Sequence, residues 1–341
     1  MIWRKTEPDL AKPAQRDAKR VLIIHLGDLG EFVRALGPAK AIREFHIGAR
    51  ITLLTTEAVK ALAEKCPYFD MVEVDGKPKE PQAITQLIGR IRSAKYDMIY
   101  DLEGSSRTNS YFQGLRPWPP HWSGPNPNAS HAYLEPDREQ IHPLDAYRRQ
   151  LELAGIPLDH EPLPDLSWVR MALRDPPRLR PDYFGLRGPY VLLLPRGDAA
   201  AKDRRWPEAK YVDIACRIAR QGVTPVVLGG PEERDIGAAI ARGEPTAKNL
   251  VTRADLFQAV GLAQKAAYVL GDDVDLMHVA AAAGAQCLAF LSTNANPERD
   301  APRGPGGVVG FTAAVVADLP VEQVERQLRN AGVLRAERAT A

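Results

Sequence analysis

The chain has 341 residues, of which 45% are hydrophobic and 26% charged, a globular composition that excludes disordered and fibrous proteins. Its 45 basic and 43 acidic residues leave a net charge of +2, which does not favour a nucleic-acid coat. The length predicts two domains. The sequence has no run of about 18 apolar residues, so it predicts no membrane span. Residues 1–20 lack the apolar core of a secretory signal, so we expect none.

Apolar segments alternate with helical ones in the first part of the chain. This alternation favours parallel strands joined by helical crossovers. The segment 114–143 contains seven prolines and predicts long loops with one short strand, and such loops often carry binding functions. We expect strands over 21–25, 50–55, 71–74 and 97–101, and helices over 31–45, 57–65, 81–94 and 144–153.

The same alternation restarts after a proline-rich linker at 157–189. The sequence therefore predicts two doubly wound α/β domains, 1–170 and 171–341, which face a cleft. Ligands bind such sheets at the carboxyl ends of their strands. In the second domain we expect strands over 190–194, 224–228, 268–270 and 286–291, and helices over 207–221, 232–241, 254–264, 276–283 and 321–331.

The loop after the first strand reads His-Leu-Gly-Asp-Leu-Gly-Glu and ends at Glu31. Its glycines allow a tight turn, and either Asp28 or Glu31 could act as a general base. Alternatively, Glu31 is only an acid that the helix dipole favours in a first turn. The loop is not G-x-G-x-x-G, so the dinucleotide fingerprint is absent.

A cluster of four cations follows the first strand of the second domain. Arginine presents a planar fork that matches phosphate oxygens, so this cluster suits a diphosphate. The alternative is a solvated loop that neighbouring aspartates partly neutralise. The cations are Arg196, Lys202, Arg204 and Arg205.

Two further strand-to-helix junctions carry polar candidates. After Gly229-Gly230-Pro231, Glu232 could accept hydrogen bonds from ribose hydroxyls, or it could simply begin a helix. Farther on, Asp273 and His278 are expected to face the cleft, although a lone histidine is often structural. Cysteines 66, 216 and 287 are far apart, so we expect reduced thiols and neither a disulfide nor a metal site.

In this order, the motifs resemble glycosyltransferase family 9, the ADP-heptose:lipopolysaccharide heptosyltransferases, over residues 20–310. The resemblance implies the GT-B fold, with the acceptor in the first Rossmann-like domain and the nucleotide sugar in the second. It rests on residues 26–33 (LGDLGEFV), 51–56 (ITLLTT), 96–107, 205–207 (RWP), 229–232 (GGPE), 277–278 (MH) and 292–304.

The resemblance also implies residue roles. The catalytic aspartate of the family corresponds to Glu31 and its lysine to Arg204, while its donor-loop aspartate and histidine correspond to Asp273 and His278. The implied reaction moves a sugar from a nucleotide diphosphate, here expected to be ADP, to an acceptor hydroxyl. A carboxylate takes the proton, and cations stabilise the diphosphate without a metal or a further cofactor.

This chain departs from the family pattern at the donor loop. The family has Ser/Thr-Gly where this sequence has Val274-Asp275, which places a carboxylate where the phosphate is expected. We expect Asp275 to cap its own helix and to weaken ADP-sugar binding. At position 31, glutamate is one methylene longer than aspartate, and a misplacement of about 1 Å can reduce the rate about 100-fold.

Three functions are compatible with these residues. The first is an active glycosyltransferase acting on a lipopolysaccharide-core or related envelope glycan. The second is a catalytically degenerate member that binds or scaffolds in envelope polysaccharide assembly. The third, a doubly wound enzyme such as a nucleotide-sugar epimerase, is disfavoured by the missing glycine fingerprint and the tandem layout.

The resemblance implies a nucleotide-sugar donor and a glycan or glycolipid acceptor as partners, and we expect no nucleic acid. Basic residues near the N-terminus alternate with acids, which predicts only weak attraction to the cytoplasmic face of the inner membrane. Residues 105–107 could meet an acidic acceptor, or they could only cap a helix. The complete set is catalytic Glu31 and Arg204; donor-binding Arg196, Lys202, Arg205, Glu232, Asp273 and His278; and acceptor-binding Asp28, Ser105, Ser106 and Arg107.

Overall fold

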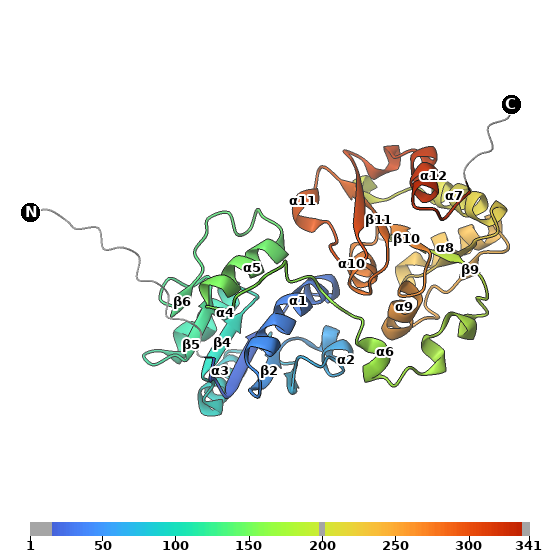
Figure 1. Ribbon diagram of the computed structural model, residues 1–341. Helices are drawn as coiled ribbons and strands as arrows, with labels where there is room; N and C mark the ends of the chain where they lie inside the picture. Colours follow the sequence, from blue (N-terminus) through green and yellow to red (C-terminus); the bar gives the residue numbers. More distant parts are fainter. Residues whose placement is uncertain (1–15, 198–201, 336–341) are drawn as a thin grey trace, which may run out of the picture. The chain divides into compact units, whose positions relative to one another are not determined.

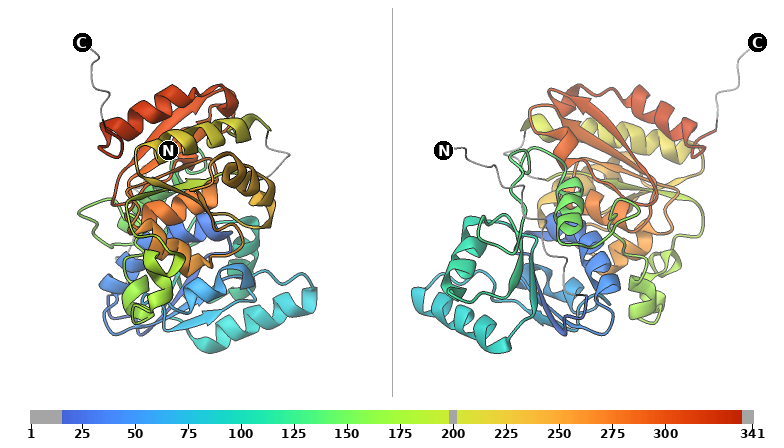
Figure 2. Two further views of the ribbon diagram at one scale, coloured as in Figure 1. Left: turned by 90° about the vertical axis from the view of Figure 1, so that its right-hand side faces the viewer. Right: turned by 60° about the vertical axis from the view of Figure 1, so that its left-hand side comes forward.

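The computed structural model describes residues 16–197 and 202–335. The chain divides into an N-terminal unit, Met1–Pro162, and a C-terminal unit, Leu163–Ala341. The boundary falls inside the expected proline-rich linker, before the division expected at residue 170. Each unit contains a parallel six-stranded sheet with helices on both faces (Figures 1 and 2).

The sheet of the N-terminal unit has the order β3-β2-β1-β4-β5-β6. Its strands are β1 (Arg20–Ile24), β2 (Arg50–Leu54), β3 (Met71–Glu73), β4 (Met98–Asp101), β5 (His121–Gly124) and β6 (His131–Ala132). Its helices are α1 (Leu29–Phe45), α2 (Lys60–Ala63), α3 (Pro81–Ala94), α4 (Ser106–Leu115) and α5 (Pro143–Leu153). The chain reverses direction across the sheet between β1 and β4.

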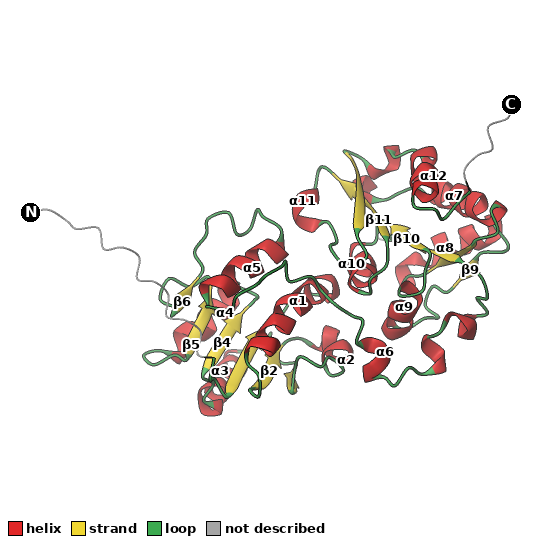
Figure 3. Ribbon diagram, viewed as in Figure 1, coloured by secondary structure: helices red, strands yellow, loops and turns green. Residues whose placement is uncertain are grey.

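The C-terminal unit repeats this arrangement with the order β12-β11-β10-β7-β8-β9. Figure 3 shows that its strands, like those of the N-terminal unit, lie between helices. Its strands are β7 (Tyr190–Leu194), β8 (Thr224–Val227), β9 (Lys248–Asn249), β10 (Tyr268–Gly271), β11 (Cys287–Ser292) and β12 (Val308–Ala313). Its helices are α6 (Val169–Ala172), α7 (Glu208–Arg220), α8 (Arg234–Gly243), α9 (Leu256–Ala263), α10 (Val274–Ala282), α11 (Pro297–Asp300) and α12 (Val321–Asn330). Both sheets thus have the doubly wound order, in which ligands bind where the strand order reverses.

The central strands are buried on both faces, which is why they are continuous apolar runs. In β1, Leu22 and Ile24 belong to a core that also contains Leu87 of α3 and Tyr111 of α4. In β7, Val191 and its neighbours on the same face pack with residues of α7, α8 and α12. Burial of these apolar surfaces provides the main driving force for folding of each unit.

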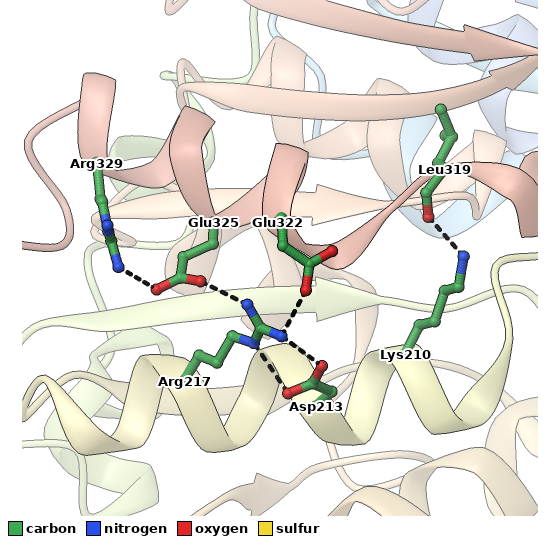
Figure 4. Close-up of polar contacts among 7 residues, drawn as sticks. All are labelled: Lys210, Asp213, Arg217, Leu319, Glu322, Glu325 and Arg329. Carbon is green, nitrogen blue, oxygen red and sulfur yellow. Dashed lines mark hydrogen bonds and ion pairs between the residues drawn. The ribbon is translucent and has the colours of Figure 1, made fainter.

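A polar network fixes the last helix, α12, to α7 (Figure 4). The Arg217 guanidinium lies 2.9 Å from Asp213, 2.8 Å from Glu322 and 2.7 Å from Glu325. Nearby, Lys210 Nζ donates to the Leu319 carbonyl at 2.8 Å. The ion pairs hold the second half of α7 against α12, and Lys210 anchors the beginning of α7, which directly follows the predicted arginine cluster.

Several predicted details are wrong. The segment 114–143 contains two strands, β5 and β6, rather than one, and β9, β12 and α4 were not expected. These elements lack a strong periodic pattern of apolar residues. Strands β6 and β9 have two residues each and are defined by pairing with β5 and β8. Helix α10 begins at Val274 rather than at residue 276, with consequences for the donor loop.

Candidate functional site

The expected catalytic carboxylate lies on the first turn of α1. Glu31 Oε2 accepts a hydrogen bond from the Asp28 backbone N–H at 3.1 Å, and Oε1 lies 4.0 Å from the Arg34 guanidinium. The Glu31 side chain is 55% exposed. A side chain at Gly27 would collide with the Glu31 carboxylate, so glycine is required there. This geometry fits a first-turn acid and also leaves the carboxylate accessible to a substrate.

Buried groups lie behind this turn. His25 is 3% exposed, and burial, with help from the charges of Arg34 and Lys77, lowers its pKa to about 3. The imidazole is therefore neutral at ordinary pH. Its ring packs against Phe32 of α1 at a centroid distance of 5.9 Å. His25 thus supports the turn that carries Glu31.

Two of the predicted acceptor residues, Ser105 and Ser106, line a pocket of about 390 Å³ at the start of α4. Ser105 is the N-cap residue and accepts from the Thr108 backbone N–H at 3.4 Å. The other two predicted residues do not line this pocket: Arg107 donates to the Pro78 carbonyl at 2.7 Å, and Asp28 lies at the start of α1.

Arg138 also lines this pocket, a role that was not predicted. It donates to the Glu103 carbonyl at 3.3 Å, and among the described residues its buried Nε has no hydrogen-bond partner. Gly104 has φ +65°, and any side chain there would collide with the guanidinium. The only sequence signal was a basic residue within the proline-rich segment 114–143.

A buried carboxylate fixes the loop between β4 and α4. Asp101 Oδ1 accepts from the Gly104 backbone N–H at 2.8 Å. Burial raises the pKa of Asp101 to about 6, although hydrogen bonds from Gly104 and Thr108 act in the opposite direction. Asp101 therefore holds the pocket wall rather than facing a ligand.

Another buried carboxylate, Asp272, organises the donor side. Its Oδ1 accepts from the Arg196 backbone N–H at 2.9 Å and from the Tyr211 hydroxyl at 2.5 Å. Its Oδ2 accepts from the Trp206 backbone N–H at 2.6 Å. Burial raises the pKa of Asp272 to about 6. This carboxylate joins the loops after β7 and β10 to the start of α7.

Two of the predicted cations are gathered around Asp272. Arg196 Nε donates to the Asp272 carbonyl at 3.1 Å, and Arg205 Nε donates to the Arg196 carbonyl at 3.1 Å. Each guanidinium therefore uses one N–H on the backbone. Arg204 is exposed on a 3-10 turn, Lys202–Arg204. The Lys202 side chain and residues 198–201 lie outside the described part of the chain.

The Gly-Gly-Pro loop buries Glu233, the residue that follows the predicted donor residue Glu232. Glu233 is 7% exposed, and its carboxylate accepts from the backbone N–H groups of Gly197 at 2.7 Å and Gly230 at 2.6 Å. Glu232 is exposed. Which of the two adjacent glutamates is buried depends on how the turn is oriented, and the sequence does not show that orientation.

The expectation that Asp275 caps α10 is wrong. Asp273 is the N-cap residue and accepts from the Leu276 backbone N–H at 3.2 Å, while Asp275 is exposed on the first turn. Burial, reinforced by Glu233 and Asp275, raises the pKa of Asp273 to about 7. The remaining predicted residue, His278, is buried within α10.

Three further observations bear on the class of site. Within residues 16–197 and 202–335, no three histidine, cysteine or acidic side chains are grouped so that they could hold a metal. Cysteines 66, 216 and 287 form no disulfide among the described residues. Of the helices in these residues, none combines the length and the apolar character that crossing a membrane requires.

The sequence profile of glycosyltransferase family 9 (heptosyltransferase) matches residues 84–305, more than half of the chain. The chain belongs to this family. It is a member of a glycosyltransferase family whose donors are nucleotide sugars and whose acceptors are glycans, as the motifs predicted. No curated protein sequence matches the chain.

Solved structures show the same fold at low identity. A family 9 glycosyltransferase from Veillonella parvula has a TM-score of 0.77 at 18% identity, covering 93% of this chain and 98% of that one. The E. coli ADP-heptose lipopolysaccharide heptosyltransferase II gives 0.71 at 18%, covering 92% and 98%. The E. coli heptosyltransferase WaaC with ADP gives 0.70 at 16%, covering 92% and 99%. The GT-B architecture of two Rossmann-like domains is therefore confirmed.

Proposed function

We propose that the protein transfers a heptose-like sugar from an ADP-linked donor to a hydroxyl of a lipopolysaccharide-core or related envelope glycan. The observation that carries the proposal is the Asp272 clamp, which gathers Arg196 and Arg205 at the carboxyl end of β10. Guanidinium groups held by backbone contacts are preorganised for a diphosphate. The likeness to E. coli heptosyltransferase WaaC with ADP supports this choice of nucleotide.

The proposal gives each unit one half of the reaction. In the N-terminal unit, the pocket lined by Ser105, Ser106 and Arg138 binds the acceptor, and Glu31 removes the proton from the acceptor hydroxyl. The acceptor oxygen forms a bond to the anomeric carbon as the bond from that carbon to the diphosphate breaks. In the C-terminal unit, Arg196, Arg204 and Arg205 take the charge of the departing diphosphate, and Glu233 or Glu232 accepts from the ribose hydroxyls.

The alternative is a degenerate member that binds without turnover. It is supported by the two carboxylates at the start of α10, Asp273 and Asp275, because like charges repel a diphosphate. The raised pKa of Asp273, about 7, weakens this objection because part of that group is neutral near neutral pH.

Calorimetric titration with ADP, UDP and GDP separates the two. We expect the wild type to bind ADP at micromolar concentration. The double variant Val274→Ser with Asp275→Gly should bind ADP about tenfold more tightly, because it removes the repulsion of roughly 1–4 kcal/mol between the Asp275 carboxylate and the diphosphate. Asp235→Ala, which removes a first-turn acid from α8, is the matched control and should leave binding unchanged. Binding by the double variant alone would support the degenerate alternative.

We also propose that the protein works at the cytoplasmic face of the inner membrane with weak surface attraction. The support is the basic residues of 16–20, since residues 1–15 lie outside the described part of the chain. Cell fractionation at low and high salt tests this: weak electrostatic attachment predicts release from the membrane fraction by salt.

A further inference from the structure

A cation-lined pocket lies in the C-terminal unit, away from the donor loops. It has a volume of about 370 Å³, and its lining includes Asp182 and four cationic residues: Arg170, Arg180, Arg187 and Lys265. It opens beside Tyr190, the first residue of β7, whereas the Arg196 loop follows Leu194, the last residue. A strand of five residues separates these points by about 13 Å.

Two of the arginines are held in place by one carboxylate. Arg170 Nε donates to Asp175 Oδ1 at 2.9 Å, and the Arg180 guanidinium donates to Asp175 Oδ2 at 3.0 Å. These hydrogen bonds lower the pKa of Asp175, so it stays ionised. Arg174 and Asp175 have φ values of +58° and +43°, a left-handed backbone that turns the chain back between the two arginines.

The hydrogen bonds to Asp175 leave N–H groups of Arg170 and Arg180 available for a ligand in the pocket. A guanidinium has five N–H donors, and Asp175 occupies only part of each set. Among the described residues, the side chains of Arg187 and Lys265 form no ion pair. The wall between the cations is apolar: Leu186 is buried, and the hydroxyl of Tyr190 donates to the Leu262 carbonyl at 2.6 Å and does not compete for a ligand.

The charge balance favours an anion. Four cations face two carboxylates, Asp182 in the lining and Asp175 behind it. Two fixed guanidinium forks with two further cations suit a tetrahedral, multiply charged group better than a single carboxylate, because arginine pairs with phosphate oxygens in a bidentate manner.

We propose that this pocket is a binding site for a phosphate group, either a free phosphate or one carried by a larger molecule such as a lipid headgroup. The site is separate from the proposed donor site. A bound phosphate would connect Lys265, just after α9, to the 170–187 segment. That segment already packs on α9, where Gln258 Nε2 donates to the Arg178 carbonyl at 3.3 Å. Phosphate binding would therefore stiffen the stretch between the unit boundary and β7.

Titration with inorganic phosphate, followed by calorimetry and by thermal unfolding, tests the site. We expect saturable binding to the wild type and at least tenfold weaker binding to Arg187→Ala with Lys265→Ala. The matched control, Arg220→Ala with Arg242→Ala, removes two cations of α7 and α8 and should bind as the wild type does. Equal affinity in the Arg187/Lys265 variant, or no saturable binding to the wild type, would overturn the proposal.

Two comparisons separate this site from the donor site. Arg205→Ala should keep the phosphate response, and the Arg187/Lys265 variant should bind ADP as the wild type does. If the Arg205 variant instead loses the phosphate response, the bound phosphate occupies the donor loops and the second site is refuted. If no form binds ADP, the proposed function fails, while the phosphate data still decide this proposal.

Vesicle flotation distinguishes the sources of the phosphate. Phosphatidylcholine vesicles with and without phosphatidylglycerol are mixed with the wild type and the Arg187/Lys265 variant. Flotation that needs phosphatidylglycerol and both cations would identify a lipid headgroup. Binding of free phosphate without such flotation would identify a small molecule. Absence of both would refute the proposal.

Discussion

The two units share one strand order, and the loops after β1 and β10 bury different polar groups. In the N-terminal unit, the loop after β1 has the neutral His25 beneath an exposed Glu31. In the C-terminal unit, the loop after β10 has the buried Asp272, which holds three segments together. One loop therefore has an acid that faces outward, and the other has an acid that is an internal clamp, as Asp101 is at the end of β4. The identity of the buried group determines how each loop responds to mutation and pH.

The sharpest difference should appear when each acid is neutralised. Glu31→Gln keeps the shape of an exposed side chain and removes the base, so under the proposed function turnover should fall by about 100-fold or more. The free energy of unfolding should change little, because the side chain is half exposed. Steady-state kinetics and urea unfolding measure the two effects. Glu31→Asp, which carries the residue of the family, should retain much of the activity, and full activity of Glu31→Gln would remove Glu31 from catalysis.

Asp272→Ala should instead affect stability first. It leaves the N–H groups of Arg196 and Trp206 and the Tyr211 hydroxyl without their acceptor, and each unsatisfied buried donor costs about 1–3 kcal/mol. We expect a loss of about 3 kcal/mol or more in urea unfolding, with ADP affinity lowered about 100-fold. Tyr211→Phe removes one of the three donors and should lose about 1 kcal/mol. A stable Asp272→Ala protein with normal ADP binding would show that the clamp is dispensable.

The buried groups should also give pH responses of opposite sign. The pKa of His25 falls from 6.5 to about 3 on folding, so the unfolded chain takes up the proton first and stability is lost as pH falls below 6.5. The pKa of Asp272 rises from 3.8 to about 6, so the folded chain takes up the proton first and stability is gained as pH falls from 6 towards 4. Each effect amounts to about 3 kcal/mol over this range.

Single variants isolate these responses, which is necessary because the buried Asp101 of the N-terminal unit acts like Asp272. Unfolding at pH 4, 5, 6 and 7 should show that His25→Leu removes part of the acid sensitivity of the wild type. Asp272→Asn should make the protein more sensitive to acid than the wild type. Parallel curves for all three proteins would mean that these groups titrate alike in the folded and unfolded chains.

The sequence predicted those parts of the fold that burial marks along the chain. The runs Val-Leu-Ile-Ile in β1 and Tyr-Val-Leu-Leu-Leu in β7 are apolar because both faces are covered, and Pro81 marks the start of α3. Strand β6 has no such signal, since its two residues form a strand through pairing with Ser123 and Gly124 of β5.

In the candidate site, the sequence indicates which loops carry polar residues but not the structural role of each side chain. Asp272, Asp273 and Asp275 stand in one acidic run, and local pattern does not show which is buried, which caps the helix and which is exposed. The choice depends on hydrogen-bond donors from distant segments: Trp206 and Tyr211, which donate to Asp272, lie far before it in the chain. The same reason explains why Glu233 and Arg138 were missed.

The smallest expected effect concerns ion pairs on the helices of each unit. Arg217 of α7 is 22% exposed and contacts three carboxylates, so Arg217→Ala should destabilise the protein by about 1 kcal/mol, and less in 1 M salt. In the N-terminal unit, Arg148 of α5 is partly exposed and, among the described residues, forms one ion pair, with Glu152 at 2.9 Å, so Arg148→Ala should have no measurable effect in urea unfolding. Because the Arg217 ion pairs hold α7 against α12 and α7 begins beside the arginine cluster, Arg217→Ala should also weaken ADP binding slightly, whereas Arg148→Ala should not. The two variants could instead have equal effects on stability and ADP binding. That result would mean that the Arg217 network between α7 and α12 stabilises the protein no more than the Arg148–Glu152 pair within α5.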